Sequence, residues 1–176
     1  MRSRHAGLLM PLFSAASSTS WGIGEIPDVA PLARWLGAAG FDRLMLLPLG
    51  AMAAQQSSPY SAMSALALDP IYTGIARLED FRRAGGTATL GADDRASLEA
   101  ARLRRSVDYA TVRRVKDTAL RLAFDRFVAE EWRAQSGRAA ELAAYIDRER
   151  EWLDDYALFA ALSEKLRMPR WRDWPE

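Results

Sequence analysis

The chain has 176 residues, and its 24 Lys and Arg balance its 23 Asp and Glu to leave a formal charge of +1. Hydrophobic residues make up 49% and charged residues 27%, a composition typical of one globular domain or part of one. The near-neutral charge lacks the basic excess of a dedicated nucleic-acid binder. Because the chain has no cysteine and one histidine, His5, disulfides, thiolate or multi-histidine metal sites and cysteine nucleophiles are also excluded.

The N-terminal part of the chain predicts a strand, a helix and a second strand. The apolar run Gly7–Phe13 predicts the first strand, and the polar stretch Ser14–Glu25 predicts a loop. A helix is expected to begin at Pro27-Asp28 and to end at Gly40. The next strand is apolar on both faces over Leu44–Leu47, which is typical of a parallel sheet covered by helices. These elements together form a βαβ unit.

A long loop over Leu49–Pro70, with at most one helical turn, is expected after the second strand. Residues 1–80 hold 5 Arg and 6 acidic residues, whereas residues 81–176 hold 19 Lys or Arg and 17 acidic residues. Apolar spacing in the second part predicts four helices. They are expected over Ala92–Arg105, Val112–Val128, Leu142–Ile146 and Trp152–Leu166. We therefore predict a βαβ unit with long loops over residues 1–81 and a helical insertion over residues 82–176.

The predicted sheet is too small to stand alone. Two parallel strands and one crossover helix cannot cover both faces of a sheet or protect its edges. A closed (β/α)8 barrel takes about 250 residues. We interpret the chain as an α/β protein that forms the N-terminal part of a (β/α)8 TIM barrel, with its first two strands and the helical insertion, and with the barrel incomplete at the chain end. The alternative is that the helical half covers the two strands.

The two loops that follow the predicted strands are the candidate binding segments, because function in a parallel barrel gathers at the carboxyl ends of the strands. Both loops are longer than usual and carry aromatic and hydroxyl side chains. A sugar ring has apolar C–H faces and a rim of hydroxyls, which flat aromatic rings and short hydroxyl side chains match. Trp21, Ser58 and Tyr60 are therefore candidate sugar contacts. The alternative is that Trp21 and Tyr60 pack inside ordered loops.

Four motifs occur in a specific order along the chain. They are Trp21-Gly22-Ile23-Gly24-Glu25, Trp35-Leu36-x-Ala38-Ala39-Gly40, Leu47-Pro48-Leu49-Gly50 and Ser58-Pro59-Tyr60-Ser61-x-x-Ser64-Ala65. A terminal Trp171-x-x-Trp174-Pro175 follows them. In this order and spacing they resemble the opening of the amylomaltase family, the 4-α-glucanotransferases or disproportionating enzymes of the α-amylase clan. The resemblance spans nearly the whole chain.

The resemblance implies an activity and its site residues. Enzymes of this family cut an α-1,4-glucan, hold a covalent glycosyl-enzyme intermediate and pass it to the 4-hydroxyl of another sugar, and no cofactor is needed because carboxylates suffice. By the match to the family's SPY segment, Tyr60 is the first residue expected to contact substrate and Ser58 the second, with Trp21 as a third candidate. The family's catalytic carboxylates lie on later strands, so none is assigned here and the isolated 176-residue chain is expected to be inactive. The family commonly has Asn where this chain has Asp69, so no role is carried over to Asp69.

Other chemistry in the chain is weaker. The neighbours Asp93-Asp94 and Asp154-Asp155 are adjacent in sequence, which does not bring their carboxyl groups to one point, so independent catalysis is not expected. The basic stretch Arg102–Lys116 is interleaved with acidic residues and predicts a solvated helical surface with local ion pairs rather than an RNA site.

The expected partners are α-1,4-glucans or maltooligosaccharides and the remainder of the barrel, with no nucleic acid and no membrane. The N-terminal apolar run superficially resembles a secretory signal, but it is short and Pro11 interrupts it, so a cytoplasmic location is expected. The alternative function is that of a non-catalytic glucan-binding module or a helical protein-interaction module.

Overall fold

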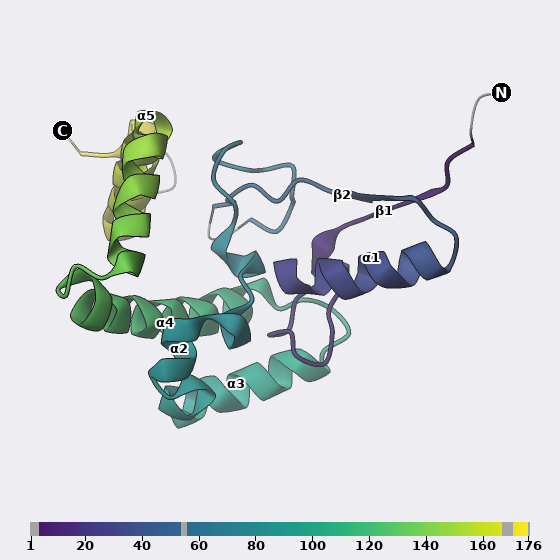
Figure 1. Ribbon diagram of the computed structural model, residues 1–176, viewed down its shortest axis with the longest axis horizontal. Coiled ribbons are helices and arrows are strands. Elements are labelled where there is room, and N and C mark those ends of the chain that lie inside the picture. Colours follow the sequence, from purple (N-terminus) through teal and green to yellow (C-terminus); the bar gives the residue numbers. More distant parts are fainter. Residues whose placement is uncertain (1–3, 54–55, 167–170, 176) are drawn as a thin grey trace.

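The computed structural model describes residues 4–53, 56–166 and 171–175, and it is mostly helical with one small parallel sheet (Figure 1). Strands β1 (Gly7–Met10) and β2 (Arg43–Leu46) pair in parallel. Helix α1 (Val29–Ala38) makes the crossover between them, so the predicted βαβ unit is confirmed. The first strand ends earlier than predicted, because Pro11 has no N–H to donate and a 3-10 turn over Leu12–Ser14 follows it.

Helix α1 begins and ends as its sequence dictates. A 3-10 turn over Ile26–Asp28 leads into it, and the backbone N–H of Glu25 donates to Asp28 Oδ2 over 2.7 Å. After the helix, Gly40 has a φ of 86°, in the left-handed region that glycine adopts without strain. The backbone N–H of Ala6 then donates to Asp42 Oδ1 over 3.1 Å, which fastens the chain before β1 to the chain before β2.

One face of the sheet is exposed. Leu9 and Met45 lie opposite each other in the register of the two strands, and 59% and 65% of their surfaces are exposed. The alternate residues Leu8 and Leu44 are half-buried on the other face. Both faces of the sheet are therefore apolar, as predicted, and within the described part of the chain the helical half does not close over the face that bears Leu9 and Met45.

The second part of the chain is helical, with short connecting turns. Its helices are α2 (Glu79–Arg83), α3 (Ala92–Leu103), α4 (Tyr109–Phe127) and α5 (Gly137–Leu166). Single turns lie over Pro70–Tyr72, Ile75–Arg77, Gly86–Thr89, Val128–Trp132 and Trp171–Asp173, the fourth of them a π-helix. Within the described ranges, no helix is both long and apolar enough to span a lipid bilayer.

The helices predicted for α3 and α4 are confirmed, whereas the prediction of two separate C-terminal helices is wrong. Helix α5 continues unbroken through the charged stretch between them, at the end of the molecule away from the sheet (Figure 1). That stretch holds neither Gly nor Pro, and Arg150 donates to Asp147 one turn earlier over 3.1 Å. The predicted boundary between residues 81 and 82 falls inside α2, and the division into two units stays a prediction.

The core lies between the loop after β1, the segment around residues 71–81, and helices α3 and α4. Its fully buried apolar side chains include Leu12, Trp21, Ile23, Ile71, Ile75, Phe81, Leu98, Val112 and Val115. The loop after β1 passes so close to the 3-10 turn that a Cβ on Gly24 would lie 1.9 Å from the Leu12 carbonyl oxygen. The second half of this loop, with Trp21 and Ile23, is therefore part of the core, whereas residues 16–19 are exposed.

A cluster around Asp80 joins three helices. The Asp80 carboxylate on α2 accepts hydrogen bonds from Arg126 on α4, over 2.8 Å, and from Arg138 on α5, over 2.9 Å. Arg138 also lies over the ring of Phe127, with 5.4 Å from its guanidinium carbon to the ring centroid. The Arg138 hydrogen bond lowers the pKa of Asp80 below its ordinary value of 3.8.

Acid unfolding is therefore expected to depend on Asp80. Because the folded-state pKa lies below the unfolded value, the stabilisation from Asp80 is present at neutral pH and lost as pH falls through the lowered pKa. An Asp80→Asn variant should have a lower free energy of unfolding than the parent chain at about pH 7, with a smaller gap at about pH 2.5. Urea unfolding at both pH values measures the gap, with the exposed Asp93→Asn as control. A gap that is the same at both pH values would contradict the assignment.

Candidate functional site

A cavity of about 540 Å³ lies beyond the carboxyl end of β1, and its size is that of a small-molecule site. Three segments line it: the loop after β1, the loop after β2 and the connection between α3 and α4. The lining residues are Phe13, Ser14, Ala16, Gly22, Ser57, Arg104, Arg105, Ser106, Val107 and Tyr109. Both loops that the sequence singled out therefore reach the same cavity.

The cavity combines aromatic rings with hydroxyl groups. Phe13 and Tyr109 meet edge to face, with 6.4 Å between ring centroids and 72° between the ring planes. Burial raises the pKa of the Tyr109 phenol, so its hydroxyl stays protonated at neutral pH and can donate a hydrogen bond. The side chains of Ser14 and Ser57 are exposed at the same cavity. Apolar ring surface beside short hydroxyl side chains is chemistry that suits a sugar.

The loop after β2 folds back on itself as a hairpin. Gly50 faces Leu68 and Met52 faces Ala62 in isolated antiparallel bridges, and the backbone N–H of Met63 donates to the Ala51 carbonyl over 2.7 Å. The expectation of a long loop with at most one helical turn agrees with the described part of this segment, where a 3-10 turn begins only at its last residue, Pro70. The two segments of the hairpin pair with each other at its base. Its far end, around residues 56–61, extends toward solvent.

Ser58 and Tyr60 lie at this far end of the hairpin. Tyr60 is 73% exposed, Ser58 is exposed, and the Tyr60 backbone N–H donates to Ser58 Oγ over 3.4 Å. Their neighbour Ser57 lines the cavity. Both predicted residues are therefore accessible to a ligand and belong to a segment that reaches the cavity.

The third predicted residue, Trp21, lies in the core. It is 1% exposed, and its indole meets the ring of Phe81 edge to face at a centroid distance of 5.6 Å. The alternative reading, that Trp21 packs inside an ordered loop, describes its place in this structure. Its neighbour Gly22 lines the cavity with a φ of 77°, so the buried indole fixes the backbone that forms this part of the wall.

Two buried ion pairs lie behind the cavity, and the first joins Asp69 to Arg113. Asp69 is 1% exposed, and its carboxylate receives both terminal nitrogens of Arg113 on α4, over 3.0 and 2.8 Å. The backbone N–H groups of Met52 and Ile71 each donate to the same carboxylate over 3.0 Å. Asp69, whose role the resemblance left open, therefore fixes the base of the hairpin to α4.

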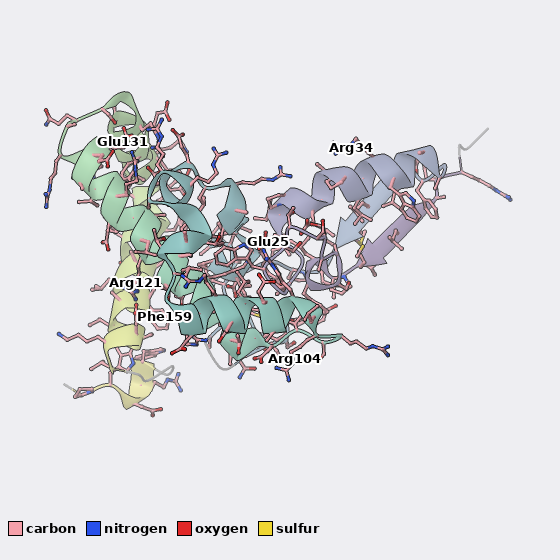
Figure 2. The ribbon with its side chains drawn as sticks, turned by 90° about the horizontal axis from the view of Figure 1, so that it is seen from below. Glu25, Arg34, Arg104, Arg121, Glu131 and Phe159 are labelled. Atoms are coloured by element: carbon pink, nitrogen blue, oxygen red, sulfur yellow. The ribbon has the colours of Figure 1, made fainter. Side chains whose placement is uncertain are left out.

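The second ion pair joins Lys116 on α4 to Glu25 in the loop after β1. Lys116 Nζ lies 2.7 Å from Glu25 Oε1, and it donates to the carbonyls of Ile71 over 2.6 Å and Thr73 over 2.9 Å. Glu25 Oε1 also accepts from the Trp21 backbone N–H over 3.1 Å. Burial raises the pKa of the Glu25 carboxyl and lowers the pKa of the Lys116 ammonium, while their attraction opposes both shifts. Glu25 lies near the middle of the molecule in Figure 2, and its buried ion pair with Lys116 places it against α4.

These two ion pairs were not predicted from the sequence. The sequence predicted a solvated surface with local ion pairs over Arg102–Lys116, which is correct for Arg102 and Arg104, whose partners lie three or four residues away on exposed surface. The prediction is wrong for Lys116, which is buried, and for Arg113, which is half-buried, because both pair with residues far away in sequence. The available signal was the position of Lys116 in the apolar stripe of α4, where a charged side chain requires a buried partner.

The acidic neighbours do not form a catalytic pair at the cavity. Asp93, Asp154 and Asp155 are exposed on α3 and α5, and Asp94 is paired with Arg114. In the described part of the chain, no group of three or more His, Cys, Asp or Glu side chains is placed to hold a metal ion.

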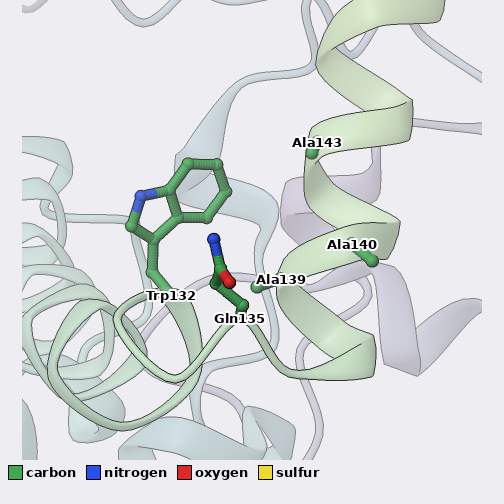
Figure 3. A pocket seen from close by; sticks show the side chains of 5 residues that line it. All are labelled: Trp132, Gln135, Ala139, Ala140 and Ala143. Atoms are coloured by element: carbon green, nitrogen blue, oxygen red, sulfur yellow. The ribbon is translucent and has the colours of Figure 1, made fainter.

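A second hollow, of about 300 Å³, lies between the π-helical turn and α5. Figure 3 shows Trp132 and Gln135 on one side of it and three alanines of α5 on the other. It is mainly apolar, and none of the motif residues lines it. The larger cavity beyond β1 is therefore the better candidate site.

Comparison with known proteins identifies the family. The family model described as 4-alpha-glucanotransferase, glycoside hydrolase family 77, matches residues 10–176. The chain belongs to the 4-alpha-glucanotransferase family. The resemblance read from the four motifs is thereby confirmed.

Curated relatives carry the same name. The 4-alpha-glucanotransferase of Chlamydia pneumoniae is 28% identical over 170 residues, covering 97% of this chain and 31% of the relative. That of Mycobacterium tuberculosis is 29% identical over 183 residues, covering 97% of this chain and 24% of the relative. The 4-alpha-glucanotransferase DPE2 of Oryza sativa subsp. japonica is 26% identical, with 92% and 16% covered. The chain thus spans less than a third of the length of these relatives.

Proposed function

We propose that this chain forms the glucan-binding N-terminal part of a 4-alpha-glucanotransferase. The complete reaction cuts an α-1,4-glucan, holds the cut segment as a covalent glycosyl-enzyme intermediate and transfers it to the 4-hydroxyl of an acceptor sugar. In this proposal Tyr60 stacks on a sugar ring and Ser58 offers a hydroxyl to it. The observation that carries the proposal is the 540 Å³ cavity of aromatic and hydroxyl groups, which is lined by Ser57, the neighbour of Ser58 in the same segment.

The catalytic carboxylates are proposed to lie outside this chain. Retaining transfer requires two carboxyl groups about 5–5.5 Å apart that face the substrate. The buried carboxylates of Glu25, Asp28 and Asp69 instead accept hydrogen bonds from the chain's own donors, and none of the three lines the cavity. These three carboxylates therefore hold loops in place, and we do not propose them as catalytic groups.

The two strands are proposed to be the first two of a (β/α)8 barrel. The exposed apolar face with Leu9 and Met45 supports this, because a sheet with two apolar faces requires cover on both. In this arrangement the remainder of the barrel covers that face, and the cavity lies at the carboxyl ends of the strands, where barrel enzymes bind substrate.

We expect the isolated 176-residue polypeptide to catalyse no glucan transfer. We expect the longest native polypeptide that contains it to convert maltotriose into glucose and longer oligosaccharides. Both are purified, incubated with maltotriose and compared with a mock-purified control by chromatography of the products. Products from the 176-residue polypeptide above that control would contradict the assignment of the catalytic carboxylates. Inactivity of the native polypeptide would favour the alternative, a non-catalytic binding or interaction module.

A further inference from the structure

We propose that Arg113 is a positioning residue for glucan binding. It fixes the hairpin that bears Tyr60 in its position relative to helix α4, whose first residue lines the cavity. The inference rests on the proposed function, since it concerns how the glucan site is held together. Arg113 itself is not among the residues that line the cavity. It acts through Asp69 on one side and through its own helix on the other.

On the hairpin side, the contact is a bidentate ion pair. Both terminal nitrogens of Arg113 meet the two oxygens of Asp69, a bidentate geometry that fixes direction as well as distance. Because Asp69 also accepts from the backbone N–H groups of Met52 and Ile71, the guanidinium holds two backbone segments through one carboxylate. The Asp69 backbone N–H donates to the Leu49 carbonyl over 2.9 Å, which closes the base of the hairpin.

On the helix side, Arg113 follows Tyr109 by four residues, so the two side chains lie on the same face of α4. Tyr109 lines the cavity, and Arg113 lies close enough to lower the pKa of its phenol, against the larger effect of burial. The hairpin that carries Ser57 and the helix that carries Tyr109 are thus fixed to each other by one ion pair behind the cavity.

Helix α4 offers a matched control residue. Arg126 lies on the same helix and pairs with the carboxylate of Asp80, and its side chain is 12% exposed, against 16% for Arg113. Arg126 holds helices α2 and α4 together and contacts no segment of the cavity wall. Loss of either arginine breaks an ion pair of α4, although Asp80 keeps its pair with Arg138, and only loss of Arg113 should release the hairpin.

The test compares Arg113→Gln, Arg113→Lys and Arg126→Gln in the native polypeptide that contains this chain. Arg113→Gln is expected to raise the KM for maltotriose about 10- to 100-fold with kcat nearly unchanged, because binding geometry is lost and the reacting groups are intact. Arg113→Lys should recover part of the effect, since the ammonium keeps the charge and loses the bidentate geometry. Arg126→Gln should lower the melting temperature and leave KM unchanged.

Hydrogen exchange gives a readout that does not require activity. The amides of Met52 and Met63 should exchange faster in Arg113→Gln than in Arg126→Gln, because the hairpin opens without its anchor. If Arg113→Gln does not fold, Asp69→Asn serves as the second variant for both measurements.

The outcomes separate the two proposals. A raised KM and faster hairpin exchange specific to Arg113 support the positioning role. Equal KM values and equal exchange in the two Gln variants overturn it, even if both are less stable. A parent polypeptide without transfer activity refutes the proposed function, and the exchange comparison then still decides whether Arg113 holds the hairpin.

Discussion

Replacement of Lys116 by methionine is expected to lower the free energy of unfolding by about 3–5 kcal/mol. Lys116 is 1% exposed, and its ammonium donates to the carbonyls of Ile71 and Thr73 as well as pairing with Glu25. Methionine fills most of the volume but leaves the Glu25 carboxylate buried without its cation. An unpaired buried charge is far more costly than the absence of the whole pair.

Urea unfolding of the parent chain and the variant measures this loss. The double variant Glu25→Gln/Lys116→Met should be more stable than Lys116→Met alone, because it removes the uncompensated charge. Lys165, the other lysine of the chain, is exposed on α5, so Lys165→Met is the matched control and should change stability little. Equal stability of Lys116→Met and Lys165→Met would show that the buried pair does not stabilise the fold.

Substitution of Tyr60 by alanine is expected to lower kcat/KM for glucan transfer about 5- to 150-fold in the native polypeptide, an estimate taken from base–aromatic stacking energies of about 1–3 kcal/mol. The ring is 73% exposed, so its loss removes little packing from the fold. Pro59 fixes its own φ and limits how the hairpin presents the next side chain. The effect should therefore fall on substrate binding and not on stability.

Kinetics and the melting temperature of the same variant distinguish the two readings of Tyr60. Tyr60→Phe should retain most activity if stacking dominates, and Trp35→Ala, which removes a 64% exposed ring from α1, should retain all of it. Parent-like kinetics combined with a melting point several degrees lower would remove Tyr60 from the site.

The elements that the sequence predicted correctly are those with a local cause. The βαβ unit follows from short apolar runs, a proline at the start of α1 and a glycine at its end, all within a few residues of one another. Helices α3 and α4 follow from apolar spacing in the same way. The continuity of α5 was not predicted because its apolar residues form no single stripe along the helix. The charged stretch between its two apolar parts was therefore interpreted as a connection between two helices.

The parts of the site that were missed depend on contacts between distant residues. Asp69 and Arg113 are 44 residues apart, and nothing near either one in sequence identifies the partner. Trp21 was proposed as a sugar contact because it lies in the loop after the first strand, yet it packs against Phe81, which lies in a different segment. The part of the cavity that the α3–α4 connection forms could not be predicted from the sequence either, because only the folded chain brings Tyr109 beside Phe13.

The burial of Lys116 also divides the two lysines of the chain by reactivity. Lys165 presents its amine to solvent on α5, whereas the amine of Lys116 is enclosed and held by three oxygen atoms. Amine-directed reagents thus have one accessible lysine side chain in the folded state. Among the lysine side chains, labelling of the folded chain is therefore expected on α5, and modification of Lys116 becomes a chemical signature of the opened chain.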